Sequence, residues 1–311
     1  MKRTVKIGTR GSQLALWQAE FIKRSLAEHS PDIEFEIVVI KTTGDRILDT
    51  ALSKIGDKGL FTREIEDALL SGKIDLAVHS LKDLPTTQPD GLTIGAVTKR
   101  ETPNDVLIAK TVNSIGELPE NARVATGSLR RRSQLLHLRP DIEVTDMRGN
   151  VPTRVEKFLD SNLDAMILAY AGIHRLGLDE HIRQLIPVDE MIPAVGQGAI
   201  AVETRTGDLS SLIAGVNDID TQLCVTAERA FLRVLEGGCQ VPIGAYAICS
   251  GDEILLHGFV GSLDGSRVIR ERMSGKREGA EKLGSDLAAV CLSLGANEIL
   301  SSARTASSET A

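Results

Sequence analysis

The sequence predicts an α/β protein with two related lobes and a cleft between them, followed by a small C-terminal α+β domain. In the first two thirds of the chain, short β-rich runs alternate with longer amphipathic runs, which is typical of mainly parallel sheets with helices on both faces. Similar helix starts, Phe61-Thr62-Arg63 and Pro152-Thr153-Arg154, suggest that the lobes are related. The last third changes to strand candidates joined by turn-like sequences, and a length of 311 residues fits two or three domains.

The first lobe is predicted to comprise residues 1–98 together with 197–216. Its apolar spacing predicts helices at 12–27 and 62–70, with Ser12 as the N-cap of the first. Its strands are predicted at 5–8, 35–40 and 74–78.

The second lobe is predicted at residues 99–196 and the C-terminal domain at 217–311. The second lobe has predicted strands at 105–109, 123–125, 142–145 and 165–168, and predicted helices at 129–138 and 153–159. In the C-terminal domain, helices are predicted at 222–235 and 281–294, with strands at 245–249, 254–260 and 267–271. The segment Gly196-Gln197-Gly198 is interpreted as a hinge between the lobes.

Composition argues against several classes of partner. Aromatic residues make up 3% of the chain and its net charge is −7, so nucleic-acid binding is not expected. The N-terminal segment lacks the apolar core of a signal peptide, and no apolar run is long enough to span a bilayer. The four cysteines and six histidines lack the spacing of metal sites. We therefore expect a reduced cytoplasmic protein without a metal, a membrane or a nucleic-acid partner.

One cysteine stands apart from the others. Cys239 follows Gly237 and Gly238 and precedes Pro242, so its thiol is predicted to lie on an accessible loop. Local context leaves two interpretations open, a chemically active thiol and an inert structural one. The remaining cysteines are interpreted as structural: Cys224, Cys249 and Cys291.

Several arginines follow predicted strands or begin predicted helices. A helix N-terminus favours anions, and the planar guanidinium binds carboxylates and phosphates, so these positions indicate an anion site. The arginines are Arg10, Arg130, Arg131, Arg148 and Arg154. Because adjacent helical residues point about 100° apart, Arg130, Arg131 and Arg132 cannot all face one ligand. Surface arginines paired with acids are the alternative.

A carboxylate lies at the same kind of junction. Asp83 follows a predicted strand within Ser80-Leu81-Lys82-Asp83, where it could stabilise a substrate cation or hold an N–H group. An N-cap role for Asp83 is the alternative.

Ordered motifs from about residue 7 to about residue 244 give the sequence a resemblance to the porphobilinogen deaminase family, also called hydroxymethylbilane synthases. The motifs are Gly8-Thr9-Arg10-Gly11-Ser12, Leu14-Ala15-Leu16-Trp17-Gln18-Ala19, Lys58-Gly59-Leu60-Phe61, His79-Ser80-Leu81-Lys82-Asp83, Ser128-Leu129-Arg130-Arg131, Arg148-Gly149-Asn150, Pro193-Ala194-Val195-Gly196-Gln197-Gly198 and Glu236-Gly237-Gly238-Cys239-Gln240-Val241-Pro242. The resemblance implies lobes like those of periplasmic binding proteins and a small third domain.

The resemblance also implies the chemistry. Members of the family join four porphobilinogen units head to tail, with loss of ammonia at each step, and release hydroxymethylbilane for haem and chlorophyll biosynthesis. The chain grows on a dipyrromethane cofactor bound through a thioether to a cysteine that matches Cys239. Each pyrrole ring brings two carboxylates, which explains the need for many cations. The family suggests a monomer.

Roles are carried over to matching positions. The catalytic residues implied are Asp83, Lys82 and Arg10. The cofactor-binding residues implied are Cys239, Ser80, Lys82, Asp83, Thr126, Ser128, Arg130, Arg131, Arg148 and Gly149. The substrate-binding residues implied are Arg10, Ser12, Phe61, Arg148, Arg154, Arg175 and Gln197. Lys54 and Lys58 match a flexible region of the family.

Two departures and two rival functions remain. Gly127 replaces a usual serine, which removes one hydroxyl, and Pro152 replaces a common glycine in a position compatible with a helix start. A non-catalytic two-lobed protein that binds carboxylates is one rival function. An acyl-transfer enzyme is the other, and it would need a histidine near Cys239.

Overall fold

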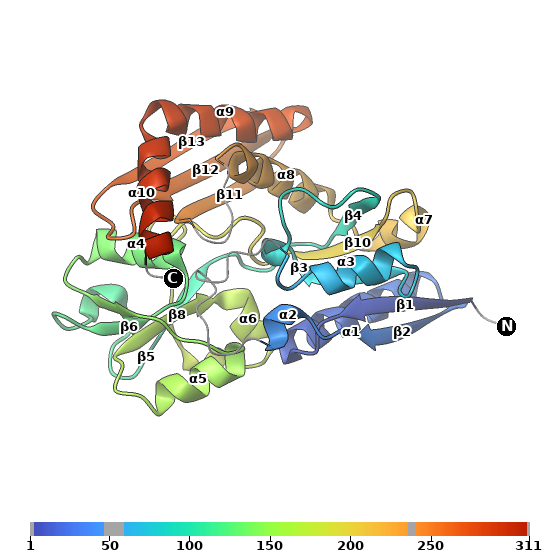
Figure 1. Ribbon diagram of the computed structural model, residues 1–311, viewed down its shortest axis with the longest axis horizontal. Coiled ribbons are helices and arrows are strands. Elements are labelled where there is room, and N and C mark those ends of the chain that lie inside the picture. The colour runs from blue at the N-terminus through green and yellow to red at the C-terminus, as the bar shows by residue number, and fades with distance from the viewer. Residues whose placement is uncertain (1–2, 47–58, 236–240, 310–311) are drawn as a thin grey trace. The chain divides into compact units, whose positions relative to one another are not determined.

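The computed structural model describes residues 3–46, 59–235 and 241–309 of the chain (Figure 1). The chain divides into two compact units, each treated by itself below. The first unit is Met1–Leu48, Asp57–Glu101 and Gly198–Leu223; the second is Asp49–Gly56, Thr102–Gln197 and Cys224–Ala311. The three-domain division proposed from the sequence stays a prediction.

The first unit is built on a five-stranded sheet with the order β2-β1-β3-β10-β4. Its strands are β1 Arg3–Thr9, β2 Ile33–Val39, β3 Leu76–Ser80, β4 Leu92–Val97 and β10 Ile200–Arg205. β1 pairs in parallel with β2 and β3, whereas β10 is antiparallel to both β3 and β4. The expectation of a mainly parallel sheet was therefore wrong for the β10 side, because neither β4 nor β10 was predicted.

Helices cover both faces of this sheet. They are α1 Gln13–His29, α2 Thr43–Arg46, α3 Arg63–Leu70 and α7 Ser210–Ile213, with short 3₁₀ turns at η2 Leu81–Asp83 and η5 Ala214–Val216. On one face α1 packs Ile22 and Leu26 against the strands, and on the other α3 packs Ile65 and Leu69. Ser12 is the N-cap of α1, as predicted, because its hydroxyl accepts a 3.3 Å hydrogen bond from the Ala15 backbone N–H.

The second unit contains a sheet of the same design, with the order β7-β6-β8-β5-β9. Its strands are β5 Asp105–Ala109, β6 Arg123–Ala125, β7 Glu143–Thr145, β8 Ala165–Ala169 and β9 Ile182–Leu185. β6 is parallel to β7 and β8, and β5 is antiparallel to β8 and β9. Each sheet thus has three parallel strands, then an antiparallel strand and an edge strand, which supports the prediction of two related lobes.

Helices also lie on both faces of the second sheet. α4 Leu129–Leu138 covers one face, and α5 Val151–Leu159 and α6 Tyr170–Arg175 cover the other. Two 3₁₀ turns, η3 Ile115–Glu117 and η4 Asp179–His181, complete this part. The bounds of α4 agree with the prediction of 129–138.

The C-terminal part of the second unit is a three-stranded antiparallel sheet with helices. Its strands are β11 Ile243–Ser250, β12 Glu253–Gly261 and β13 Val268–Lys276, and η6 Arg277–Gly279 leads into α9 Ala280–Ser293 and α10 Ala296–Glu309. α8 Ile219–Val234 enters this part from the last residues of the first unit. The α+β class of this segment is confirmed, although α10 was not predicted.

The three described cysteines all belong to this segment. Cys224 and Cys291 are buried on α8 and α9, as predicted, and Cys249 is half-buried near the end of β11. The Cys224 and Cys249 sulfurs are 3.5 Å apart. Burial raises the pKa of the Cys291 thiol to about 12.

No single helix in the described ranges has both the length and the apolar composition of a membrane span; the bent pair Arg277–Ser293 and Ala296–Thr305 meets both criteria only when its two helices are taken together. Among the same residues, no three His, Cys, Asp or Glu side chains gather as metal ligands would.

Candidate active site

The first unit contains a small pocket at the carboxyl ends of β1 and β3. Its volume is about 60 Å³. Open α/β sheets usually bind ligands at this edge. The lining residues are Arg10, Ser12, Leu14, Ala15, Gln18, Phe61, Thr62, Val78, His79, Ser80 and Asp83. The structure thus brings together five predicted site residues, Arg10, Ser12, Phe61, Ser80 and Asp83. Lys82 lies in the same turn but does not line the pocket.

Arg10 is held in place by an acid that the sequence did not single out. Its Nε and Nη2 atoms donate hydrogen bonds of 3.1 and 2.5 Å to Asp45 Oδ1. The guanidinium carbon also lies 4.0 Å from the centre of the Phe61 ring, within the range of a cation–π contact. A side chain at Gly44 would collide with that ring, since a Cβ atom there would come within 2.2 Å of it. Arg10 is therefore oriented from two sides.

The pKa of Asp45 reflects this pairing. Burial of the carboxyl raises the pKa, but the hydrogen bond and charge of Arg10, together with Thr42, outweigh that cost and lower it overall. Both Arg10 and Asp45 stay partly accessible, with side chains 23% and 26% exposed. The Arg10 guanidinium can therefore contact both Asp45 and a ligand.

Asp83 lies in the turn that follows β3. Leu81 is buried and its N–H donates to the Ala199 carbonyl, which anchors this turn and leaves Asp83 exposed. Ser80 is fixed by Gln18, whose Nε2 donates a 2.8 Å hydrogen bond to the Ser80 hydroxyl. Across the described part of the chain no N–H group donates to the Asp83 carboxylate, so the alternative N-cap role is wrong. Its oxygens are available to a ligand.

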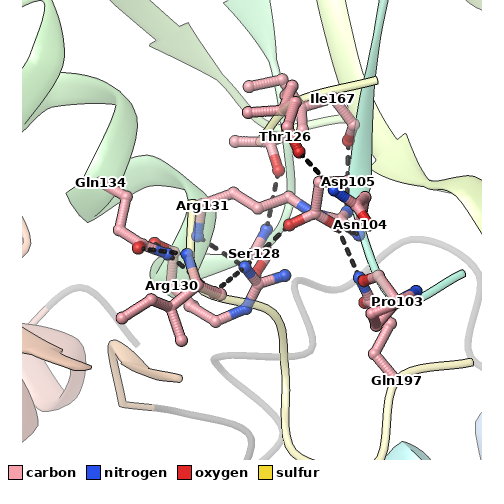
Figure 2. A network of polar contacts seen from close by, with 12 residues as sticks. Pro103, Asn104, Asp105, Thr126, Ser128, Arg130, Arg131, Gln134, Ile167 and Gln197 are labelled. Carbon is pink, nitrogen blue, oxygen red and sulfur yellow. Dashed lines mark hydrogen bonds and ion pairs between the residues drawn. The ribbon is translucent and has the colours of Figure 1, made fainter. Parts of the chain in front are cut away.

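The second unit contains a buried cluster of arginines around Asp105 (Figure 2). Arg130 Nη1 donates a 2.8 Å hydrogen bond to Asp105 Oδ2, and Arg131 donates to Oδ1 from Nε at 3.0 Å and from Nη2 at 2.8 Å. Gln197 Nε2 adds a fourth donor at 2.9 Å. We call Asp105, Arg130, Arg131 and Gln197 the Asp105 cluster.

The charges of this buried cluster do not cancel. The Asp105 side chain is fully buried, and those of Arg130 and Arg131 are 5% and 8% exposed. Burial alone would raise the pKa of Asp105, but the two guanidinium groups hold it well below its usual range. Because two cations share one carboxylate, the cluster carries one excess positive charge.

The start of α4 lies beside this cluster (Figure 2). Ser128 is the N-cap of α4 and accepts a 3.4 Å hydrogen bond from the Arg131 backbone N–H. The buried Thr126 hydroxyl accepts in turn from the Ser128 N–H at 3.3 Å. The two hydroxyls thus order the helix start, a role the sequence predicted only for Ser12.

A third group of predicted residues follows β7. Gly149 has φ +125°, a conformation that favours glycine, and its carbonyl accepts a 2.6 Å hydrogen bond from Arg154 Nε. Pro152 lies in the first turn of α5, as expected, after the N-cap Asn150. Within the described residues the Arg148 guanidinium has no hydrogen bond or ion pair, and its side chain is half-buried. It is the predicted arginine best placed to receive an anion.

Two other predicted positions remain. Arg175 is the last residue of α6 and is half-buried. Cys239, Lys54 and Lys58 lie outside the described residues. The residues that the sequence missed are two acids and two amides: Asp45, Asp105, Gln18 and Gln134. Their partners are distant in the sequence, so no local pattern points to them.

Comparison with known proteins identifies close relatives. A family model described as porphobilinogen deaminase, dipyromethane cofactor binding domain, matches residues 5–212, and one described as porphobilinogen deaminase, C-terminal domain, matches residues 222–292. The porphobilinogen deaminase of Chloroherpeton thalassium is 53% identical over 98% of this chain and 99% of its own length. That of Pelotomaculum thermopropionicum is 51% identical over 98% of both chains.

Similarity to solved structures is much weaker. The aliphatic sulphonate binding protein SsuA of Escherichia coli has a TM-score of 0.40 at 17% identity, covering 76% of this chain and 71% of its own. The methionine-binding protein MetQ has a TM-score of 0.43 at 12% identity, covering 68% and 89%. At these scores the likeness carries no conclusion about this chain.

Proposed function

The chain belongs to the porphobilinogen deaminase family, and from that premise we propose which of its residues bind and activate the pyrroles. Its activity is the stepwise condensation of porphobilinogen units on a dipyrromethane cofactor, with release of ammonia. Family membership favours this enzyme over a carboxylate-binding protein or an acyl-transfer enzyme. The residue roles below are the proposal.

We assign the reacting centre to the pocket around Asp83. The observation that carries this assignment is an exposed carboxylate that receives no hydrogen bond from the described protein and shares its pocket with the oriented cation Arg10. Loss of ammonia leaves a cationic pyrrole, which a fixed carboxylate stabilises. Asp83 also binds pyrrole N–H groups, while Arg10, with Ser12 beside it, binds a ring carboxylate. Phe61 holds the guanidinium plane in place.

The donor set also fits a dipyrromethane, whose rings carry several carboxylates. The Arg148 guanidinium pairs with none of the described residues, and the Asp105 cluster offers one excess positive charge beside the start of α4. Helix N-termini and arginines are the usual partners of carboxylates. When bound, this group supplies the pyrrole carbon to which each new unit is joined. We propose that Ser80, Lys82, Thr126, Ser128, Gly149 and these arginines hold it, with Cys239 as the point of attachment.

Substrate contacts are proposed for the remaining predicted positions. Arg154 and Arg175 would receive carboxylates of the incoming unit, and Gln197 would act by orienting Asp105, to which it donates. A monomeric state, a cytoplasmic location and the absence of nucleic-acid and membrane partners stay proposals from the sequence. Size-exclusion chromatography with light scattering measures the first.

The test compares intact mass with turnover. Denatured wild-type protein should carry a mass excess of two linked pyrrole units on the Cys239 peptide, and Cys239→Ser should lose it. Cys249→Ser is the matched control and should keep it, since that thiol belongs to the C-terminal sheet. A Cys239→Ser protein that keeps the adduct and turns over normally would overturn the attachment site.

A further inference from the structure

Two of the three described cysteines form a close pair in the C-terminal part of the second unit, and neither takes part in the proposed mechanism. Cys224 lies on α8 and is 6% exposed, whereas Cys249 lies near the end of β11 and is half-buried. Their sulfur atoms are 3.5 Å apart. The fold thus places two thiols, 25 positions apart in the sequence, within reach of one another.

The packing of α8 on β11 brings these two sulfurs together. Cys224 and Glu228 are four positions apart on α8, so they lie on the same face of the helix. Ala247 and Cys249 are two positions apart on β11, so they point to the same face of the sheet. The buried Glu228 carboxylate accepts a 2.8 Å hydrogen bond from the Ala247 N–H. The contact between the cysteines therefore lies one helical turn from a second contact that fixes the helix to the strand.

The two thiols differ in their access to solvent. Cys249 adjoins the turn between β11 and β12, where residues 250–253 are exposed. Cys224 is buried beneath the surface of the same segment. Oxidation of a dithiol by a small disulfide needs one accessible sulfur, which reacts first, and a second sulfur close enough to displace the reagent. Cys249 and Cys224 meet these two requirements.

The alternative is a pair of inert packing thiols that share a weak hydrogen bond. Disulfide sulfurs are about 2.05 Å apart, so these two must approach by about 1.5 Å to form a bond. Small rotations of the two side chains provide a change of this size. The geometry therefore permits the bond without a rearrangement of α8 or β11.

We propose that Cys224 and Cys249 are a redox-active dithiol, which a small disulfide such as oxidised glutathione converts into an intramolecular disulfide. The Cys249 sulfur attacks the small disulfide, whose S–S bond breaks, and one thiol leaves. The Cys224 sulfur then attacks the Cys249 sulfur, the S–S bond of the mixed disulfide breaks, and the second thiol leaves. The two cysteines lose two electrons and two protons, which the small disulfide takes up as it becomes two thiols.

The new bond would close a covalent loop that contains Cys239. Residues 225–248 lie between the two cysteines, with α8 before Cys239 and β11 after it. A crosslink restricts the unfolded chain and so stabilises the folded one. Oxidised protein therefore keeps α8 and β11 together at temperatures at which the reduced protein unfolds. This dithiol does not depend on the residue roles proposed for catalysis.

The test incubates reduced full-length protein with excess oxidised glutathione and maps the cysteine peptides without reduction. Wild type should yield Cys224 joined to Cys249. Cys224→Ser should stop at one glutathione on Cys249, because no second thiol displaces it. Cys249→Ser should take up none at Cys224, which is buried. Cys291→Ala is the matched control and should form the same disulfide, since the Cys291 thiol is fully buried and its pKa is raised to about 12.

Melting curves measure what the crosslink does to the fold. Oxidised wild type should melt roughly 3–8 °C above reduced wild type. Dithiothreitol should reverse this rise by reducing the bond. Oxidised glutathione should not raise the melting temperature of Cys224→Ser, which cannot form the crosslink.

Several results would overturn the proposal. They are a wild-type map without the Cys224–Cys249 peptide, a map in which Cys239 or Cys291 replaces either cysteine, and a Cys224→Ser protein without glutathione on Cys249. A disulfide that forms without raising the melting temperature contradicts the stabilising effect. If a variant does not fold, the wild-type map still decides. Failure of the proposed function would show elsewhere, as wild-type protein that lacks the pyrrole adduct or does not consume porphobilinogen.

Discussion

The two units present their arginines in opposite ways. In the first unit Arg10 is 23% exposed, pairs with one carboxylate and lines a pocket. In the second unit Arg130 and Arg131 are nearly buried and share Asp105 with Gln197. All three follow a strand or begin a helix, so their sequence positions predicted the same anion-binding role for each. Burial and the number of internal partners thus separate an accessible guanidinium, which has room for a ligand, from buried ones that are largely committed to Asp105.

That difference has an energetic meaning. An exposed pair contributes little to stability, because water solvates both charges almost as well. A buried cluster depends on every member, since removing one leaves uncompensated charge in a medium of low polarity. Substitutions in the first unit should therefore change turnover while the fold survives, and substitutions in the second should change the fold first.

The largest effect is expected at Asp105. Asp105→Asn leaves two buried guanidinium groups without a counter-charge, so the free energy of unfolding should fall by about 3–5 kcal/mol. Denaturant titration measures this. Glu281→Gln is the matched control in the same unit, because its pair with Arg233 is 69% and 41% exposed and should contribute at most about 1 kcal/mol. Equal effects of the two changes would contradict the contrast between buried and exposed pairs.

Substitution of Asp83 is expected to have the opposite effect, a loss of turnover without a loss of stability. Asp83→Asn should lower turnover roughly 10²- to 10³-fold, because it removes the charge that stabilises the cationic pyrrole. Its melting temperature should stay near wild type, since the described residues donate nothing to that carboxylate. Initial rates of hydroxymethylbilane formation and a melting curve on the same sample measure both. Near-normal turnover would remove Asp83 from the mechanism.

The helix caps should behave alike in both units. Ser12→Ala and Ser128→Ala each remove a hydroxyl that accepts a backbone N–H bond at a helix start. Each should lower the free energy of unfolding by about 1 kcal/mol. A much larger loss of stability in Ser128→Ala than in Ser12→Ala would mean that the Ser128 cap also supports the Asp105 cluster. The two units would then differ in their helix caps as well as in their arginines.

The smallest effect is expected at Asp45, in the pH dependence of the free energy of unfolding. The folded pKa of Asp45 is lowered, so its pairing with Arg10 stabilises the fold above the unfolded pKa and is lost as pH falls through the folded value. The difference in unfolding free energy between wild type and Asp45→Asn should therefore be constant from pH 5 to 7 and shrink below about pH 4. Because both side chains are partly exposed, we expect at most about 1 kcal/mol. A difference that grows in acid would contradict the assignment.

The sequence predicted local features better than distant pairings. Helix α4 and the Ser12 cap follow from apolar spacing and a capping hydroxyl, which are local signals. β10 was missed although it is buried, since Glu203 interrupts its apolar run. α10 was missed because its serine-rich sequence has a weak apolar pattern.

In the candidate site, too, local features were predicted and distant pairings were not. Arg10, Ser12, Ser80 and Asp83 were predicted and share one pocket. Asp105 lies 25 positions from Arg130, and Glu203 lies far from His79, so only the fold joins them. Charge pairs of this kind carry no periodicity. Such charge pairs can be found only after the strands have been placed, by searching for a buried cation that still needs an acidic partner.

The position of β10 in the first sheet has a consequence for synthesis on the ribosome. About 100 residues separate the end of β4 at Val97 from the start of β10 at Ile200. At the usual rate of elongation, roughly 5–20 s pass before β10 emerges. During that interval β3 has only β1 beside it, and the turn bearing Asp83 lacks the Ala199 carbonyl that anchors it. The nascent chain must therefore extend through a whole second sheet before the turn that bears Asp83 can take its final position.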